Sequence, residues 1–348
     1  MEEPTWISEG NPSQLERLLQ DLKVIVPEAR VSKLGPAGDG NMNVTLRAEL
    51  MTDGIAETLI VKQSRSYVAK YDFIAAPIER IEFESAFYRY VAHDASLQTL
   101  LPNLIAWLPH QYLLVLEDLG AASDATAMYQ QKPSRESSVL PSWIEPLVQW
   151  LCQLHSTSRG RVDVGKFRNL NLRTLNHAHI FQIPFADSPA IELDSVCPGL
   201  TDASESLRFD GSLKAVCGRL GALYLKDGDC LLHGDFYPGS WLILSDGPKV
   251  IDPEFCFAGP AEFDLGVMLA HLQISGIKNA ESAFLSYDPE NQSTDWELVF
   301  DFAAIEVLRR ILGVAQLPLS HTLDQRMALV ESAATRLNDS SRNANRSA

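Results

Sequence analysis

The 348-residue chain lacks long apolar runs and lacks an excess of positive charge. No apolar stretch approaches the roughly 20 residues that a membrane-spanning helix requires. The first ten residues, MEEPTWISEG, are acidic and polar, unlike the basic start of a secretory signal. The formal net charge of −16 disfavours nucleic acid as a partner, because phosphate backbones are bound by clustered lysine and arginine. We therefore expect a cytoplasmic protein that binds neither membrane nor nucleic acid.

Cysteine is sparse and scattered in the sequence. The chain has five, none of them in a C-x-x-C pair: Cys152, Cys197, Cys217, Cys230 and Cys256. This pattern favours free thiols in a reducing compartment over a disulfide framework, and it disfavours a zinc site. The sequence also lacks repeats at the periods of solenoids and propellers.

The predicted elements change character near residue 120. The first part carries predicted helices at 13–28 and 78–92 and strands at 31–35, 43–50, 57–63 and 110–119. The later part carries predicted helices at 143–156, 212–225, 262–276 and 295–316, and short strands at 230–235 and 249–255. We therefore predict an α+β fold with a small antiparallel sheet lobe (1–119) and a larger, mainly helical lobe (120–337). The polar tail, residues 338–348, lacks periodicity and is predicted to be disordered.

A glycine-rich turn lies between two of the predicted strands. Its residues are Gly38, Asp39, Gly40 and Asn41. Because glycine has no Cβ, such a turn lets backbone N–H groups approach phosphate oxygens closely. The same residues also make a good hairpin turn without any ligand, so the sequence alone leaves both interpretations open.

A lysine stands among apolar residues in the next predicted strand, LIVKQ. Lys62 needs a partner for its ammonium group there, and phosphoryl-transfer enzymes use a strand lysine to hold phosphates and to pair with a helix glutamate. Glu84 is the candidate for that glutamate, and Glu82 is the alternate. The competing interpretation is a lysine on the solvent face of an edge strand.

The segment LLHGDFYPGSWLIL, residues 231–244, places a His-Gly-Asp sequence in a loop after an apolar strand. Asp235 can there accept a proton from a substrate hydroxyl, and Ser240 can offer an oxygen to a metal ion. We interpret His233 as structural, holding the loop through hydrogen bonds. A hydrolase built on His233 and Asp235 is disfavoured, because the sequence has no G-x-S-x-G nucleophile motif.

Two carboxylates follow in KVIDPEF, residues 249–255. Asp252 and Glu254 end an apolar run, and side chains two positions apart on a strand share a face. Carboxylates on one face repel each other unless a cation joins them, and Mg²⁺ held by carboxylates and phosphates meets that need. A simple Asp-Pro turn accounts for Asp252 but not for Glu254.

The motif HGD-x-x-x-x-S, followed by I-D-P-E-F and G-P-x-x-F-D-L-G, resembles the aminoglycoside phosphotransferase and choline kinase superfamily. The resemblance implies a bilobal, protein-kinase-like fold and transfer of phosphate to small molecules. In detail the chain is most similar to the 5-methylthioribose kinases, which have serine at the position of Ser240 and a D-x-E pair like Asp252 and Glu254. GDGNMN at 38–43 and RRILGVA at 309–315 extend the resemblance over about 35–316.

The resemblance also implies roles for individual residues. Asp235 would be the catalytic carboxylate, and Ser240, Asp252 and Glu254 would hold Mg²⁺. The turn at 38–41, with Lys62 and Glu84, would hold the phosphates of ATP. The remaining implied roles fall on a nucleotide-binding hinge (Glu117, Asp118, Leu119) and on residues near the acceptor (Glu254, Arg309, Arg310). The alternative for the two arginines is a helix face paired with Glu306. Asp264 is expected to brace the catalytic loop.

The implied reaction is transfer of the γ-phosphoryl group of ATP to a hydroxyl of a small molecule, for methylthioribose the anomeric one. Residues 236–239 read Phe-Tyr-Pro-Gly where the methylthioribose kinases usually have Leu-His-Thr-Gly, so the acceptor stays open. The alternatives are an aminoglycoside, choline, homoserine or fructosamine kinase, and a pseudokinase that binds nucleotide without turnover. A homodimer is left open as well.

Overall fold

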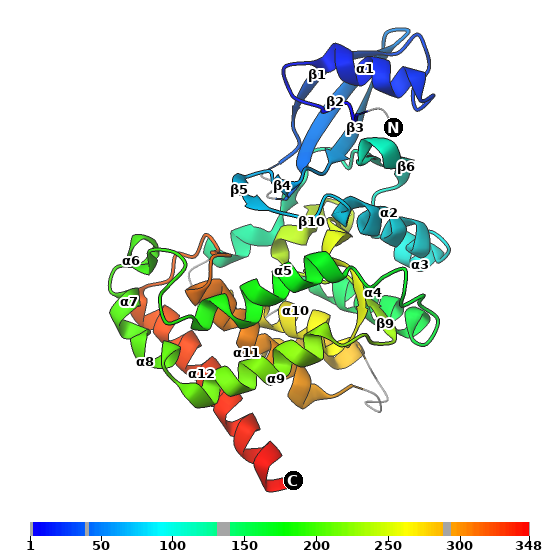
Figure 1. Ribbon diagram of the computed structural model, residues 1–348. Coiled ribbons are helices and arrows are strands. Elements are labelled where there is room, and N and C mark those ends of the chain that lie inside the picture. The colour runs from blue at the N-terminus through cyan, green and yellow to red at the C-terminus, as the bar shows by residue number, and fades with distance from the viewer. Residues whose placement is uncertain (1–2, 39–41, 131–139, 288–293, 348) are drawn as a thin grey trace. The chain divides into compact units, whose positions relative to one another are not determined.

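The structure, a computed structural model, describes residues 3–38, 42–130, 140–287 and 294–347 (Figure 1). The chain divides into two compact units. The first comprises Met1–Ala122 and Lys249–Phe255, and the second comprises Ser123–Pro248 and Cys256–Ala348. The short segment Lys249–Phe255 therefore belongs with the sheet of the first unit, whereas the sequence suggested a single division near residue 120.

A five-stranded antiparallel sheet forms the centre of the first unit. Its strand order is β1 (Arg30–Pro36), β2 (Val44–Thr52), β3 (Ile55–Gln63), β7 (Leu113–Glu117), β6 (Leu104–Leu108). The register pairs Lys62 of β3 with Thr45 of β2 and Leu114 of β7. Lys62 thus lies in the middle of the sheet, so the edge-strand interpretation is wrong.

Helix α1 (Pro12–Asp21) packs on this sheet, against β1 (Figure 1). Proline at the first helical position suits the fixed φ of that residue. Leu15 and Leu19, one turn apart, are buried with alternate residues of β1 and β2 in one apolar core. The helix is shorter than the predicted span 13–28, because Lys23 takes a positive φ of 57° just beyond its end.

The other elements of the first unit surround the lysine strand. They are the two-stranded β4–β5 sheet (Tyr67–Val68, Tyr71–Ala75), helices α2 (Arg80–Val91) and α3 (Ala95–Gln98), and the 3₁₀ turns η1 (Pro109–Gln111) and η5 (Pro253–Phe255). Strand β11 (Gly247–Val250) leads the chain back into this unit before η5. Helix α2 contacts η5, which brings the segment after β11 against the helix that carries Glu84.

Helices dominate the second unit. Its helices are α4 (Ile144–Ser158), α5 (Leu170–Phe181), α6 (Leu193–Val196), α7 (Leu200–Ala203), α8 (Glu205–Arg208), α9 (Gly211–Leu225), α10 (Glu262–Ile274), α11 (Trp296–Leu312) and α12 (Leu323–Ser347). Its 3₁₀ turns are η2 (Ala125–Gln130), η3 (Ile183–Phe185), η4 (Pro238–Ser240) and η6 (Ala280–Ser286). Two small sheets complete it. One has the strand order β11, β10 (Trp241–Leu244), β8 (Ser123–Asp124), and the other pairs β9 (Cys230–Leu232) with β12 (Phe257–Gly259).

Helices α10 and α11 form the core of this unit. Both are buried along nearly their whole length, and α11 carries the charged residues Glu306, Arg309 and Arg310 into the interior. They cross closely at Gly266, where an added Cβ would lie 2.5 Å from Phe302 Cβ and 2.9 Å from Val299 O. This packing explains why the F-D-L-G sequence has glycine at a helix position, where glycine costs about 1 kcal/mol relative to alanine.

The structure differs from the sequence-based expectations at two further places. Helix α12 continues through Ser347, so residues 338–347 are helical, where a disordered tail was predicted. Asp252 is not on a strand: β11 ends at Val250, Asp252 has a left-handed φ of 62°, and Pro253 begins a 3₁₀ turn. Among the described residues, no helix is both long and apolar enough to cross a membrane.

Candidate active site

The first unit gathers two of the predicted residues around one buried lysine. The Lys62 side chain is 4% exposed, and its Nζ donates to Glu84 Oε1 at 2.8 Å and to Asp252 Oδ1 at 2.7 Å. Glu84 faces the sheet from α2, whereas the alternate, Glu82, is exposed on the other side of that helix. The lysine therefore joins a helix glutamate to the carboxylate that follows β11.

The second carboxylate of the D-x-E pair has its own partners. Asn43 Nδ2 donates to Glu254 Oε2 at 2.8 Å, and the guanidinium of Arg80 lies 3.6 Å from the same oxygen. Arg80 is fully buried and also donates to the backbone oxygens of Met42 and Tyr67, at 2.7 and 3.3 Å. It thereby ties Glu254 to the residue that follows the glycine-rich turn.

Burial and charge act together on this cluster. Burial acts to lower the pKa of Lys62, but the negative charges of Asp252 and Glu84 outweigh it and raise that pKa well above the ordinary value. Burial raises the pKa of Glu84 to about 8, against the opposing effect of Lys62, and it raises the pKa of Glu254 as well. Three carboxylates share two cationic side chains, Lys62 and Arg80, and the raised pKa values of Glu84 and Glu254 mean that the cluster readily takes up a proton or a further cation.

The residues present fit a magnesium ion that is completed by phosphate oxygens. Within the described ranges, no group of three or more His, Cys, Asp and Glu side chains is arranged as a ready metal site. The Asp252 side chain is 44% exposed, and the buried Asn43 Oδ1 accepts no hydrogen bond from the described residues. Mg²⁺ typically uses one or two carboxylates together with waters and substrate phosphates, and Asp252 and Glu254 are the two carboxylates available here.

The predicted hinge follows β7, and its side chains are already engaged. Glu117 Oε2 accepts from Asn103 Nδ2 at 2.7 Å, and its backbone N–H donates to Asn103 O. Arg47 binds both carboxylate oxygens of Asp118, at 2.6 and 3.0 Å, and donates to Gly120 O. These contacts lower the pKa of Asp118 although burial acts to raise it. They fix the course of the hinge around Leu119.

The glycine-rich turn is described only at its first residue. Gly38 is exposed, and a Cβ added there would meet nothing within 4 Å. The predicted phosphate-binding residues Asp39, Gly40 and Asn41 lie outside the described residues. Their assignment remains a prediction from the sequence.

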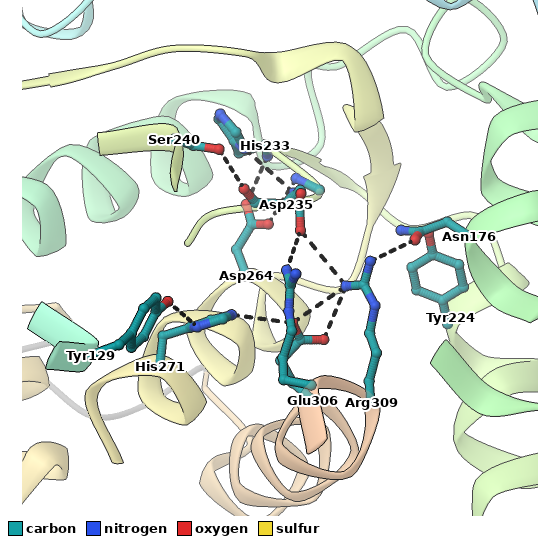
Figure 2. A network of polar contacts seen from close by, with 12 residues as sticks. Tyr129, Asn176, Tyr224, His233, Asp235, Ser240, Asp264, His271, Glu306 and Arg309 are labelled. Atoms are coloured by element: carbon teal, nitrogen blue, oxygen red, sulfur yellow. Dashed lines mark hydrogen bonds and ion pairs between the residues drawn. The ribbon is translucent and has the colours of Figure 1, made fainter. Parts of the chain in front are cut away.

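In the second unit, a carboxylate from α10 braces the His-Gly-Asp loop. Asp264 Oδ2 accepts from the backbone N–H of His233 at 2.7 Å, and its Oδ1 accepts from that of Gly234 at 2.9 Å (Figure 2). Gly234 has a φ of 85°, a left-handed conformation that suits glycine. His233 is fully buried, and its Nδ1 accepts the N–H of Asp235 at 3.4 Å, a structural role as predicted.

The carboxylate of Asp235 meets the two predicted arginines. Arg310 Nη2 donates to Asp235 Oδ1 at 3.2 Å, and Arg309 Nη1 lies 3.7 Å from the same oxygen. The Asp235 side chain is 16% exposed, and both arginines are nearly buried. Ser240 donates its hydroxyl hydrogen to Asp235 O at 3.0 Å, which closes the loop. A hydroxyl that donates one hydrogen bond can still offer the lone pairs of its oxygen to a metal ion.

A glutamate of the same helix holds both arginines. Glu306, one turn earlier on α11, accepts from Arg310 Nε at 2.6 Å and from Arg309 Nη1 at 3.1 Å. Burial acts to raise the pKa of Glu306, but the two arginines hold it well below its ordinary value. Two negative and two positive side chains therefore balance around Asp235. Glutamate–arginine pairs at i, i+3 and i, i+4 are expected on a helix face, so the sequence indicates Glu306 as a partner of the two arginines but does not indicate its burial beside Asp235.

Three comparisons with known proteins bear on this arrangement. A family model described as "Phosphotransferase enzyme family" matches residues 55–290, more than half of the chain. A methylthioribose kinase of Exiguobacterium sibiricum is 26% identical over 312 residues, which cover 82% of this chain and 74% of that relative. A methylthioribose kinase of Escherichia coli is 27% identical over 255 residues, 70% of this chain but only 58% of that relative.

Among solved structures, the choline kinase LicA of Streptococcus pneumoniae, in complex with AMP, matches with a TM-score of 0.54. The match covers 95% of this chain and 99% of that chain at 16% identity, so it bears on the fold alone. Together with the antiparallel sheet of one unit and the helices of the other, it confirms the α+β, protein-kinase-like fold that the sequence predicted.

Proposed function

Because the chain belongs to the phosphotransferase enzyme family, we propose that it is an ATP- and Mg²⁺-dependent kinase that phosphorylates a sugar hydroxyl. The acceptor we propose is 5-methylthioribose. The names of the methylthioribose kinase relatives support this acceptor, and the arrangement around Asp235 supports it independently. Residues 1–119 would bind the nucleotide, and residues 120–337 would carry the catalytic carboxylate and bind the acceptor.

The observation that carries the choice of acceptor is the balance of charge at Asp235. Arg309 and Arg310 offset the charges of Asp235 and Glu306, so these four described side chains together carry no net negative charge for a cationic acceptor. Choline and aminoglycosides are cations, and two buried arginines beside the catalytic carboxylate would repel them. A neutral, polyhydroxylated sugar can instead accept hydrogen bonds from the guanidinium groups.

The nucleotide would be held by groups of the first unit. The ammonium of Lys62, fixed by Glu84, would hold phosphate oxygens, and backbone N–H groups of the turn at 38–41 would cover the triphosphate. Adenine would meet backbone groups of the hinge, Glu117 to Leu119. The AMP in the choline kinase complex is consistent with a nucleotide site in this fold.

The metal would be held by Asp252 and Glu254, with a contribution from the hydroxyl oxygen of Ser240. When bound, Mg²⁺ neutralises charge on the transferring phosphoryl group and on the departing ADP. The surplus carboxylate and the unengaged Asn43 Oδ1 are the features that favour a cation here. Glu254 would also lie close to the acceptor.

The transfer step follows from these positions. An acceptor hydroxyl hydrogen-bonded to Asp235 attacks the γ-phosphorus, a new P–O bond forms, and the bond to the β,γ-bridging oxygen breaks. The hydroxyl proton passes to Asp235, and ADP leaves. Arg309 and Arg310 orient the acceptor and stabilise charge on the transferring group. Positioning supplies most of the acceleration, since the loose transition state leaves little covalent work for the protein.

The test is an ATP-consumption screen with the full chain over 5-methylthioribose, ribose, choline, homoserine, a fructosamine and an aminoglycoside. We expect the highest kcat/KM for 5-methylthioribose. Asp235→Asn keeps the shape of the side chain but removes the proton acceptor, so kcat should fall by about 100- to 10,000-fold while ATP binding is kept.

The possible outcomes separate the alternatives. Turnover on choline or the aminoglycoside and none on 5-methylthioribose would overturn the proposed acceptor and keep the kinase assignment. Binding of ATP without turnover on any acceptor would favour a pseudokinase. Unchanged turnover in Asp235→Asn would remove Asp235 from the catalytic role.

A further inference from the structure

A line of three buried side chains leads from η2 to the arginines at Asp235. The Tyr129 hydroxyl lies 2.6 Å from His271 Nδ1, and His271 Nε2 lies 3.2 Å from Glu306 Oε1 (Figure 2). Glu306 in turn binds Arg309 and Arg310. Tyr129, His271 and Glu306 are each 1% exposed or less, and they come from three elements far apart in the sequence.

The chemistry of the three groups fixes the direction of these hydrogen bonds. Ionised Glu306 can only accept, so His271 Nε2 carries the hydrogen. His271 Nδ1 is then the acceptor, and the Tyr129 hydroxyl donates to it. Burial supports the neutral imidazole, because it lowers the pKa of His271 to about 4. The tyrosine thus orients the histidine, and the histidine orients the carboxylate.

The carboxylate of Glu306, at the end of this line, cannot rotate without losing hydrogen bonds. Glu306 Oε1 accepts hydrogen bonds from His271 Nε2 and Arg310 Nε, and Glu306 Oε2 accepts one from Arg309 Nη1. Arg309 is held from its other side by Asn176 Oδ1, at 3.2 Å. A rotation of the carboxylate would therefore move both guanidinium groups relative to Asp235.

We propose that Tyr129, His271 and Glu306 form a positioning relay that sets the placement of Arg309 and Arg310 and thereby the affinity for the acceptor. The relay rests on the proposed function for its effect on the acceptor. Its effect on the arginines does not depend on which acceptor is used.

The same unit contains a second line of the same chemistry, which supplies a matched control. The Tyr287 hydroxyl lies 2.7 Å from His155 Nδ1, and His155 Nε2 lies 3.2 Å from Asp264 Oδ2. This line ends on the backbone of the catalytic loop instead of on the arginines. Tyr287→Phe and Tyr129→Phe therefore remove one equivalent buried hydroxyl each, at the start of different lines.

The kinetic test compares these two variants with wild type, using 5-methylthioribose as acceptor. Tyr129→Phe should raise the acceptor KM about fivefold, since a neutral hydrogen bond contributes about 1 kcal/mol and 1.4 kcal/mol is tenfold. The KM for ATP should stay within about twofold. Tyr287→Phe should leave the acceptor KM within about twofold and act on kcat. Glu306→Gln, which weakens charged contacts, should raise the acceptor KM at least about tenfold.

A second measurement needs no acceptor. In protein labelled with ¹⁵N-arginine, the Nε–H signal of Arg310 is assigned by its loss in Arg310→Lys, and its hydrogen exchange is measured. Tyr129→Phe should speed that exchange about fivefold, and Tyr287→Phe should not. Wild-type exchange and wild-type acceptor KM in Tyr129→Phe would overturn the relay. Faster exchange in a protein that phosphorylates none of the tested acceptors would keep the relay and overturn the proposed function.

Discussion

The buried imidazole of His271 should make the stability of the second unit depend on pH. Burial lowers the pKa of His271 from the ordinary 6.5 to about 4, outweighing the opposing effect of Glu306. A neutral, depressed histidine contributes stability that is fully present above pH 6.5. That contribution is lost as the pH falls toward 4, because the unfolded chain then binds a proton that the folded chain does not.

The magnitude follows from the interval between the two pKa values. The free energy of unfolding changes by about 1.36 kcal/mol per pH unit in this interval, so the protein loses about 2 kcal/mol of stability between pH 6.5 and 5. The loss reaches about 3 kcal/mol by pH 4. His271 is fully buried, so solvent screening does not reduce these values much. For a protein with a typical stability of about 5–15 kcal/mol, such a loss is readily measured.

The assay compares wild type with His271→Gln by urea unfolding at several pH values between 7 and 4. Intrinsic fluorescence reports mainly on the second unit, which holds four of the six tryptophans: Trp143, Trp150, Trp241 and Trp296. At pH 7 wild type should be the more stable, and its advantage should shrink by about 3 kcal/mol at pH 4. Tyr129→Phe is the control, since it removes a hydrogen bond but no titrating histidine. Parallel curves for wild type and His271→Gln would refute the reasoning.

Three other perturbations test the first unit and the helix core. Lys62→Met removes two charged hydrogen bonds, each contributing about 1.5–3 kcal/mol, so kcat/KM for ATP should fall at least about a hundredfold in steady-state assays. Arg47→Gln frees Asp118 of the hinge, and calorimetry should show ATP binding several-fold weaker with acceptor KM unchanged. Gly266→Ala pushes a methyl group against α11 and should cost about 1–3 kcal/mol of unfolding free energy in urea titrations, with the ratio of the two KM values kept.

The sequence predicted well those helices and strands in which apolar residues recur at a clear helix or strand spacing. The strands around Lys62 and the helix that carries Glu84 were located correctly, because apolar residues recur there at strand and helix spacing. Pairing of Lys62 with Glu84 could be anticipated because a lysine between apolar neighbours requires a buried anion. The spacing of apolar residues and the requirement of a buried lysine for an anionic partner both pointed to Lys62 and Glu84.

The end of the chain could not be predicted in this way. Residues 338–347 are polar, and nothing in their spacing indicates a buried face. In the structure they continue a helix that is anchored by tertiary contacts. Ser340 Oγ donates to Asp301 Oδ2 at 2.6 Å, and Arg336 Nε donates to Asp301 Oδ1 at 2.9 Å. Their partner lies on α11, about 35 residues earlier, so helix formation here depends on packing and not on propensity.

The pair Asp252 and Glu254 shows a prediction that was right in its residues and wrong in its geometry. Their expected shared face came from a strand, but the strand ends before Asp252. The left-handed conformation of Asp252 and the proline after it turn the chain, so each carboxylate meets a different partner. A positive φ at a residue other than glycine is rarely visible in a single sequence.

The residues most relevant to acceptor choice are connected through space and not along the chain. Tyr237 falls in the segment where the chain departs from the sequence typical of methylthioribose kinases. The centroid of its ring lies 4.5 Å from the guanidinium carbon of Arg310 and 5.3 Å from the centroid of the His271 ring. Substitutions beside Asp235 therefore act on the same arginine that the buried line from Tyr129 orients. If the proposed function holds, the choice of acceptor depends on this packed group and not on the catalytic motif alone.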